Sequence, residues 1–329
     1  MIIKLKWLVV IQAIIIAALL SAVINSYLSK TRIENKAKEG LLSSRVYSGL
    51  LEPKSFLLIN FAPLKENVKN YITKNNINAS VYVENLRNGA FMGIGEKTGF
   101  FPSSLNKLPV AIIIMKKIEM GELSLDTRIE ITDFDRTDTS GELYKTKEKE
   151  ITVEAALEKL LKESDNTALR ILLRQVDLED LQLLLDYYGL DISVDLQNKQ
   201  RLKQPDFITP KAISTLYLSL YFSTVLEPKN SEYLLLLLAE SEVDINRIAN
   251  LPENIKVAHK FGENYYGNNM FFHDCGIIYI DESRILYCIM TKDLSVEEAT
   301  ETIGTIVNQI YHYVKDTKAR LEAYTHGQK

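Results

Sequence analysis

The sequence predicts a fold of the α/β (α+β) class, in which one antiparallel sheet is built from both ends of a domain and a helical subdomain lies in between. Two observations predict it: strand-like runs lie on either side of a long middle segment, residues 104–240, and that segment has helical periodicity. A third observation, an uncharged N-terminal segment that precedes the domain, predicts an N-terminal transmembrane helix. At 46% hydrophobic residues, the 329-residue chain has ample material for a core.

The N-terminal segment, residues 7–28, carries no charged residue and would span about 33 Å as a helix. We predict a single-pass transmembrane signal anchor at 1–29, a stalk at 30–62 and one globular domain at 63–329. Basic residues after the span outnumber the two lysines before it, so the positive-inside count does not favour export. The expected placement of the domain outside the cytoplasm, at the cell membrane, therefore depends on its chemistry.

The individual elements follow from hydrophobic period and from caps. Pro210 is well placed as a first helical residue, and Ser295 with Glu298 forms a capping box. Tight turns are expected at 87–89 and 281–284. The predicted strands are 79–86, 90–94, 256–261, 270–280 and 284–291, and the predicted helices are 63–73, 104–120, 153–162, 167–174, 178–188, 210–222, 231–239 and 295–320.

Charge and composition exclude several classes of function. The net charge is −4 and no basic stripe is present, which argues against nucleic acid as a partner. The four histidines show no ligand spacing with the two cysteines, so we expect no metal and no cofactor. His259 is interpreted as structural, and for His273 with Asp274 a buried structural pair is favoured over a catalytic one.

The cysteines lie in the last two predicted strands. If Glu282 and Ser283 form a two-residue loop, Cys275 faces Met290 and the two thiols are diagonal neighbours. Diagonal neighbours are about 7 to 8 Å apart, which is too far for a ready disulfide. The sequence therefore predicts that Cys275 and Cys288 are buried free thiols.

Ser104 is the candidate nucleophile because Lys107 follows one helical turn later, at the start of an apolar helix. A serine hydroxyl needs a base to take its proton, and a buried lysine can serve once its pKa is depressed. We expect Lys107 to titrate well below a free lysine because it is desolvated and lies near Lys260. Pro109, in the same helix, is expected to bend the axis.

Two further motifs follow along the chain. Ser164-Asp165-Asn166 lies between two helical runs: Ser164 could pass a proton, Asn166 could bind a substrate amide, and Asp165 is interpreted as a structural cap. Later, Lys260 lies on a strand with Gly262 two residues on. This spacing lets a substrate lie close along the strand, with the lysine ammonium available for a carboxylate.

Together these motifs resemble those of the class A β-lactamase and penicillin-binding protein superfamily, over about residues 63–320. The resemblance implies an α/β/α sandwich with a helical subdomain, a β-lactam or peptidoglycan-type substrate, and no cofactor. It implies that Ser104 is acylated, that Lys107 and Ser164 move protons, that Asn166 holds the substrate amide, and that Lys260 binds the substrate carboxylate. The backbone N–H groups of Ser104 and Glu263 would form the oxyanion hole.

Two departures from the family pattern matter. Phe261 stands where the family usually has threonine or serine, so a hydroxyl that helps to hold the substrate carboxylate is missing. Between residues 189 and 210, where class A enzymes carry a water-activating glutamate, this chain has none, and Asp195 is the nearest carboxylate.

The leading prediction is a membrane-anchored, monomeric serine hydrolase that forms an acyl-enzyme with β-lactam or related acyl-D-amino-acid compounds. A D,D-peptidase or esterase that uses Lys107 alone as base is the nearest alternative. A non-catalytic cell-wall binding module on the same fold is another, because Phe261 and the missing glutamate both weaken the site.

Overall fold

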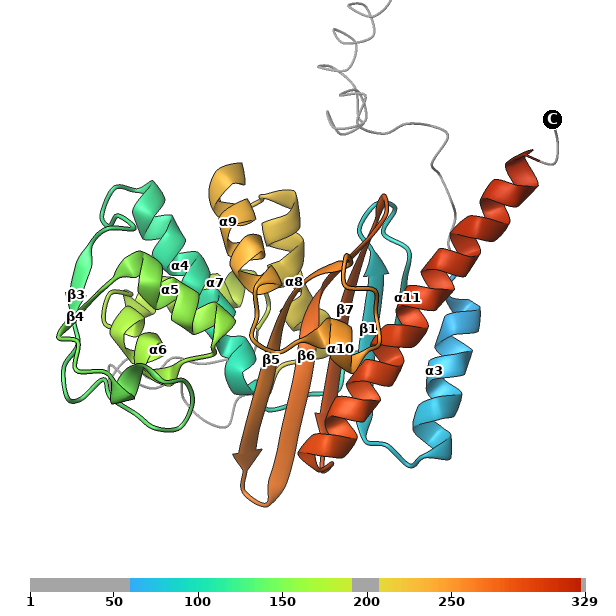
Figure 1. Ribbon diagram of the computed structural model, residues 1–329, viewed down its shortest axis with the longest axis horizontal. Coiled ribbons are helices and arrows are strands. Elements are labelled where there is room, and N and C mark those ends of the chain that lie inside the picture. The colour runs from blue at the N-terminus through green and yellow to red at the C-terminus, as the bar shows by residue number, and fades with distance from the viewer. Residues whose placement is uncertain (1–59, 191–206, 327–329) are drawn as a thin grey trace, which may run out of the picture. The chain divides into compact units, whose positions relative to one another are not determined.

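A computed structural model of the protein describes residues 60–190 and 207–326 (Figure 1). These residues all belong to one compact unit of the chain, Leu58–Lys329. The predicted membrane anchor at 7–28, most of the predicted stalk, and Asp195 lie outside the described residues. Within the described ranges, no helix combines the length and the apolar character needed to cross a membrane.

A five-stranded antiparallel sheet forms the centre of the domain, with the strand order β2-β1-β7-β6-β5. The first two strands come from the start of the domain and the other three from its end, which confirms the sheet predicted from the sequence. The central strand β7 joins the two groups by pairing with β1. The strands are β1 (Ala79–Asn85), β2 (Phe91–Ile94), β5 (Lys256–Tyr266), β6 (Asn269–Ile280) and β7 (Ser283–Lys292).

Helices cover both faces of this sheet. On one face lie α3 (Ala62–Lys74) and the long C-terminal α11 (Val296–His326), with α10 (Ile245–Ile248) beside α11 (Figure 1). The other face packs on α8 (Pro210–Phe222), which contacts β1, β6 and β7. Each face has its own buried apolar cluster, so the sheet is the middle layer of a sandwich.

The helical subdomain adjoins the α8 face. It contains α5 (Val153–Lys162), α6 (Asn166–Leu173), α7 (Leu178–Tyr187) and α9 (Pro228–Ala239) around α4 (Lys107–Glu119). Residues 107–115 of α4 are all buried, which explains the apolar character of this segment on every side. The two-stranded sheet of β3 (Arg128–Glu130) and β4 (Glu150–Thr152) and the 3₁₀ turn η3 (Leu143–Lys145) were not predicted from the sequence.

The helix expected to run from residue 104 is divided in two. A 3₁₀ turn, η2 (Ser103–Asn106), precedes α4. Pro109 therefore falls in the first turn of α4, where an N–H group has no helical acceptor in any case. The expectation that Pro109 lies past the first turn and removes a helical hydrogen bond therefore does not hold, and the bend expected there stays a prediction.

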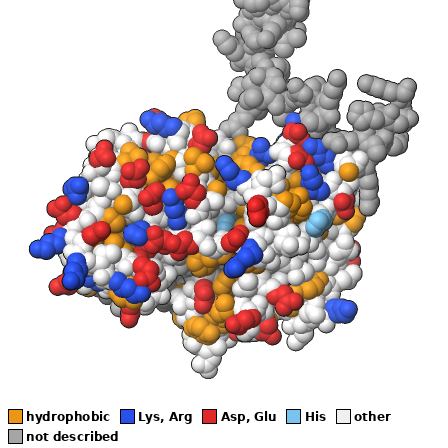
Figure 2. Space-filling view, in the orientation of Figure 1, with side chains coloured by type: hydrophobic (Ala, Val, Ile, Leu, Met, Phe, Trp, Pro, Cys, Tyr) orange, Lys and Arg blue, Asp and Glu red, His pale blue; other side chains and the backbone are white. Residues whose placement is uncertain are grey.

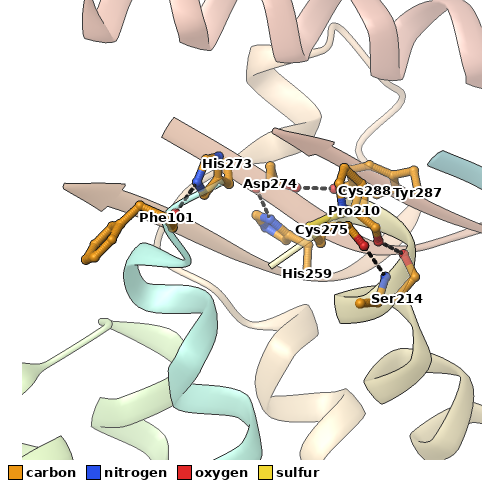
Figure 3. The surroundings of a disulfide bond; sticks show 11 residues. Phe101, Pro210, Ser214, His259, His273, Asp274, Cys275, Tyr287 and Cys288 are labelled. Carbon is orange, nitrogen blue, oxygen red and sulfur yellow. Dashed lines mark hydrogen bonds and ion pairs between the residues drawn. A yellow bond between two sulfur atoms is a disulfide. The ribbon is translucent and has the colours of Figure 1, made fainter. Parts of the chain in front are cut away.

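The prediction of free thiols is wrong, because Cys275 and Cys288 form a disulfide between β6 and β7 (Figure 3). The tight turn is Asp281-Glu282, with Ile280 paired to Ser283. This turn lies one residue earlier than predicted, which places the two cysteines directly opposite each other. Asp281 adopts a left-handed conformation with φ 49°, as the first residue of a tight hairpin turn often does.

His273 and Asp274 do not form the pair that the sequence suggested. Consecutive strand residues point to opposite faces, so His273 donates from Nε2 to the Phe101 carbonyl at 2.7 Å, and Asp274 turns the other way (Figure 3). Asp274 instead contacts His259, Nδ1 to Oδ2 at 2.8 Å, and accepts a hydrogen bond from Tyr287. Burial lowers the pKa of His273 to about 4. The structure therefore supports a structural role for His259.

The visible surface carries charges of both signs. Figure 2 shows lysines and arginines interspersed with aspartates and glutamates across this face, with smaller apolar patches between them. Exposed ion pairs among the described residues include Arg128 with Glu150 and Lys315 with Asp281. Such pairs contribute little to stability individually, about 0 to 1 kcal/mol.

Candidate active site

The short turn η2 holds Ser104 against the edge strand β5. Ser103 adopts a left-handed conformation, φ 50°, and the chain then enters α4. Gly262 lies directly beneath: a Cβ atom at this position would be 3.1 Å from the Ser104 nitrogen and 3.2 Å from the Ser103 Cβ. Glycine therefore allows the close approach of β5 to the candidate nucleophile. Ser104 itself is half-buried and so can be reached from outside.

Lys107 joins the serines of the first two motifs. Its Nζ lies 3.0 Å from Ser104 Oγ and 2.9 Å from Ser164 Oγ, and it also donates to the Ser164 carbonyl. The side chain is buried, and this burial lowers its pKa from 10.5 to about 7, against the opposing effect of the Asp165 carboxylate. The predicted direction of the shift is confirmed, and burial is its main cause.

The hydrogen-bond geometry suits both protonation states of this amine. As an ammonium, Lys107 donates three N–H bonds to its three oxygen acceptors. As a neutral amine, it keeps the two bonds to Ser164 and presents its lone pair to the Ser104 hydroxyl. The second state is the one that a base requires, and a pKa near 7 makes it accessible at neutral pH.

Ser164 lies in the connection between α5 and α6 and is 1% exposed. It adopts a left-handed conformation with φ 57°, which turns both its hydroxyl and its carbonyl toward Lys107. The Ser140 hydroxyl donates to the same carbonyl at 3.0 Å. Ser164 is therefore held from two sides, with its hydroxyl next to the amine.

Asp165 is structural, as predicted. Its carboxylate accepts from the Ala168 N–H at 2.8 Å and thereby caps α6, and it also accepts from the Leu143 N–H at 2.9 Å. Asn166 follows at the start of α6 and donates from its amide to Thr139 Oγ1 at 2.7 Å. This contact fixes the orientation of the Asn166 side chain at the rim of the site.

Lys260 approaches from β5 and is fully buried. Its Nζ donates to the Phe261 carbonyl at 3.2 Å and lies 4.2 Å from the centroid of the Phe261 ring. Burial lowers the pKa of Lys260 well below its usual value, and repulsion from Lys107 acts in the same direction. Glu263, two residues after Phe261, is exposed on the same edge strand.

The structure thus brings Ser104, Lys107 and Ser164 into one hydrogen-bonded group, with Gly262 packed on its backbone and Lys260 near enough to repel Lys107. Asn166 is instead bonded to Thr139, and Glu263 takes no part in this group through its side chain. Sequence reasoning missed the contacts of Thr139 and Ser140, which come from a loop with no periodic pattern and no motif. In the described ranges, no group of three or more acidic, histidine or cysteine side chains is placed to hold a metal ion.

Fold and site together define a serine hydrolase, and residues 63–314 match the family described as the beta-lactamase enzyme family, to which this chain therefore belongs. Beta-lactamase VEB-1 of Pseudomonas aeruginosa is 26% identical over 250 residues, which cover 71% of this chain and 82% of VEB-1. The alignment confirms the resemblance drawn from the three motifs.

Solved structures agree in fold. PBP-A superposes with a TM-score of 0.68 at 19% identity, covering 78% of this chain and 97% of PBP-A. A beta-lactamase from Chitinophaga pinensis gives 0.67 at 19% identity, covering 77% of this chain and 99% of the other. A variant of PBP-A in an acyl-enzyme complex with penicillin G gives 0.67 at 20% identity, covering 77% and 97%.

Proposed function

We propose that this protein is a membrane-anchored serine hydrolase that forms an acyl-enzyme on Ser104 with β-lactams or related acyl-D-amino-acid compounds. The observation that supports this best is the position of the Lys107 amine, 3.0 Å from one serine hydroxyl and 2.9 Å from another. A base of depressed pKa between a nucleophile and a second hydroxyl is the arrangement that acyl transfer to serine needs.

In the proposed acylation, neutral Lys107 takes the proton of the Ser104 hydroxyl as Oγ attacks the carbonyl carbon of the substrate amide. The backbone N–H groups of Ser104 and Glu263 stabilise the resulting oxyanion, helped by the start of the helix. The carbon–nitrogen bond then breaks. Ser164 donates its proton to the leaving nitrogen and regains one from the Lys107 ammonium, so the protons balance.

Substrate binding is assigned to the residues around this group. Asn166 would bind the substrate amide, Lys260 would face its carboxylate, and Gly262 would let it lie along β5. The close packing of Gly262 on η2 supports the last assignment, because it brings the edge of β5 to the nucleophile.

Deacylation is proposed to be slow. In the described residues, the side chain that hydrogen-bonds to Ser104 Oγ is Lys107, and the sequence between residues 189 and 210 contains no glutamate. An active site without a positioned base to activate water typically loses about 10²- to 10⁴-fold in the rate of the hydrolytic step. Asp195 remains the candidate replacement base.

Two alternatives differ in chemistry. A D,D-peptidase or esterase would use the same three residues on a peptide or ester carbonyl, which the geometry permits equally. Burial of Lys107 disfavours its protonated form and lowers its pKa. A non-catalytic binding module would not require such a lysine, so the lowered pKa favours an enzyme.

The proposed location is the outer side of the cell membrane, with the segment at 7–28 as a single-pass anchor and the catalytic domain acting as a monomer. β-Lactam and peptidoglycan substrates occur outside the cytoplasm. The disulfide between Cys275 and Cys288 supports this location, since disulfides persist in oxidising compartments. Protease added to spheroplasts should remove the domain, and full protection would contradict the placement.

Mass spectrometry after brief exposure to penicillin G tests the function. A stable adduct on Ser104 is expected, and it should be absent in Ser104→Ala. Rapid turnover without an adduct would point to Asp195, which Asp195→Asn would check. A folded protein with neither adduct nor turnover of penicillin or ester substrates would favour the binding module.

A further inference from the structure

The ammonium of Lys260 has an unusual environment for a buried charge. It can donate three hydrogen bonds, yet in the described part of the chain its Nζ donates to a single acceptor, the Phe261 carbonyl, and lies against the ring of the same residue. Its side chain is 0% exposed. A buried ammonium normally pairs with a carboxylate. The Asp274 carboxylate is near enough to raise the pKa of Lys260, but among the described residues it forms no ion pair with Lys260, and the Phe261 ring lies against the Nζ instead.

The positive charge of Lys107 near this ammonium favours an anion, and the smaller opposing effect of the Asp274 carboxylate offsets it only in part. Lys107 is also buried, and the two lysines are close enough to repel each other. A substrate carboxylate at Lys260 would relieve this repulsion and gain hydrogen bonds. To reach the ammonium, however, it must move the Phe261 ring and give up the contact between ring and cation.

The location of Phe261 makes this competition relevant to substrate binding. Phe261 is half-buried on the edge strand β5, and the next residue, Gly262, is the point where β5 comes closest to the Ser104 backbone. A substrate that lies along β5 to reach Ser104 and places a carboxylate at Lys260 therefore meets the ring, which lies 4.2 Å from the Lys260 Nζ.

The same strand carries a second apolar feature. Tyr266 stacks on Phe101, with ring centroids 5.2 Å apart and 7° between the planes, and Phe207 meets Tyr266 edge-on at 6.4 Å. Phe207 is 40% exposed, so this aromatic cluster of Phe101, Phe207 and Tyr266 reaches the surface. Apolar groups of a substrate would find contacts along β5 that a charged group would not.

We propose that Phe261 is a specificity-determining residue: its ring covers the Lys260 ammonium, so that the site accepts acyl donors with an uncharged group beside β5 nearly as well as those with a carboxylate. This inference rests on the proposed function, because it takes Lys260 as the group that faces the substrate carboxylate. The substrate class it favours is neutral or apolar esters and amides.

The test uses two ligands that differ only in this charge, penicillin G and its methyl ester. Dissociation constants are measured in the Ser104→Ala background, where no acylation occurs, and acylation rate constants are measured with Ser104 present. The variants are Phe261→Thr, which removes the ring and adds a hydroxyl, and Phe261→Leu, which removes the ring but stays apolar. Phe134→Thr is the control, because the Phe134 ring also lies near a cation, Arg170, but in the helical subdomain and on the surface.

We expect the acid and the ester to bind the Phe261 protein within about threefold of each other. Loss of the ring contact should lower the dissociation constant of the acid by about three- to tenfold in both Phe261 variants and leave that of the ester unchanged. In Phe134→Thr both dissociation constants should stay at their original values. An unchanged ratio in the variants, or a preference for the acid above tenfold with Phe261 in place, would overturn the inference. The second result needs no variant to fold.

The two proposals fail in different ways. A changed ratio of dissociation constants without any acylation of Ser104 would contradict the proposed function and leave the role of Phe261 standing. Acylation of Ser104 with an unchanged ratio would contradict the role of Phe261 alone.

Discussion

Replacing Lys107 with methionine should stabilise the fold while abolishing acylation. The pKa of Lys107 falls from 10.5 to about 7 on folding. At about 1.36 kcal/mol per pKa unit, keeping this side chain protonated in the folded state costs about 5 kcal/mol. Methionine fills a similar volume without a charge, so it removes this cost, although the hydrogen bonds to Ser104 and Ser164 are lost as well.

The sign of the pH dependence follows from the direction of the shift. Because the folded pKa is below the unfolded one, the unfolded chain binds more protons between about pH 7 and 10.5, and the wild type gains stability as the pH rises through this window. The advantage of Lys107→Met is therefore largest below pH 7 and shrinks toward pH 10.5. Between pH 6 and pH 9 it should fall by about 2 to 3 kcal/mol.

Urea denaturation of both proteins at pH 6 and pH 9 measures this difference. The change with pH is more informative than either value alone, because lost packing and hydrogen bonds affect both pH values similarly. Lys69→Met, at an exposed position of α3, is the control and should show no such change. An equal stability difference at pH 6 and pH 9 for Lys107→Met would refute a strongly depressed pKa for this lysine.

The remaining predictions concern the backbone of the site. Gly262→Ala should lower the acylation rate about ten- to a hundredfold in stopped-flow assays, because its Cβ would lie 3.1 Å from the Ser104 nitrogen and displace η2; an unchanged rate would contradict the close approach. Gly141→Ala should destabilise the fold by more than 2 kcal/mol in urea, because its Cβ would overlap Asp165 Oδ2 at 2.0 Å. Gly121→Ala is the matched control, since Gly121 also has a left-handed φ, 76°, but no atom within 4 Å of the new Cβ. It should lose only about 1 kcal/mol, and equal losses in the two variants would argue against the overlap.

Elements with both a clear period and a local start signal were predicted accurately from the sequence. The predicted helices at 153–162 and 210–222 coincide with α5 and α8, where the Thr152 side chain caps one helix and Pro210 begins the other. Both signals act on the first turn of their own helix, so tertiary contacts do not change where the helix begins. The first motif was found for a related reason, because Ser104 and Lys107 lie one helical turn apart and this spacing is visible in the sequence.

The failures involve contacts that no short stretch of sequence determines. The sequence-based prediction placed the Asp281-Glu282 turn one residue too late. Because side-chain partners across a hairpin depend on the register, this error alone led to a prediction of two free thiols in place of the disulfide. β3 and β4, with three residues each, are too short to show a period. Residues 139 and 140 reach the site from a loop, and their hydrogen bonds to the second motif depend on the tertiary fold.

The contact of Lys260 with Phe261 could be anticipated only in part. The sequence showed that a hydroxyl was missing from the third motif, which predicted weaker binding of a carboxylate. It could not show that the ring folds back over the neighbouring ammonium, since consecutive strand residues normally point apart. The edge position of β5 leaves room for that conformation.

The pH dependence of Ser104 acylation by penicillin G tests the central claim most directly, namely that buried Lys107 is the base. With a pKa of about 7, the second-order rate constant should rise about tenfold per pH unit up to pH 7 and level off above it. Lys107→Ala should lose at least about a hundredfold at pH 7. A rate constant that stays level from pH 5 to pH 8, or a Lys107→Ala protein that acylates at the wild-type rate, would contradict the account.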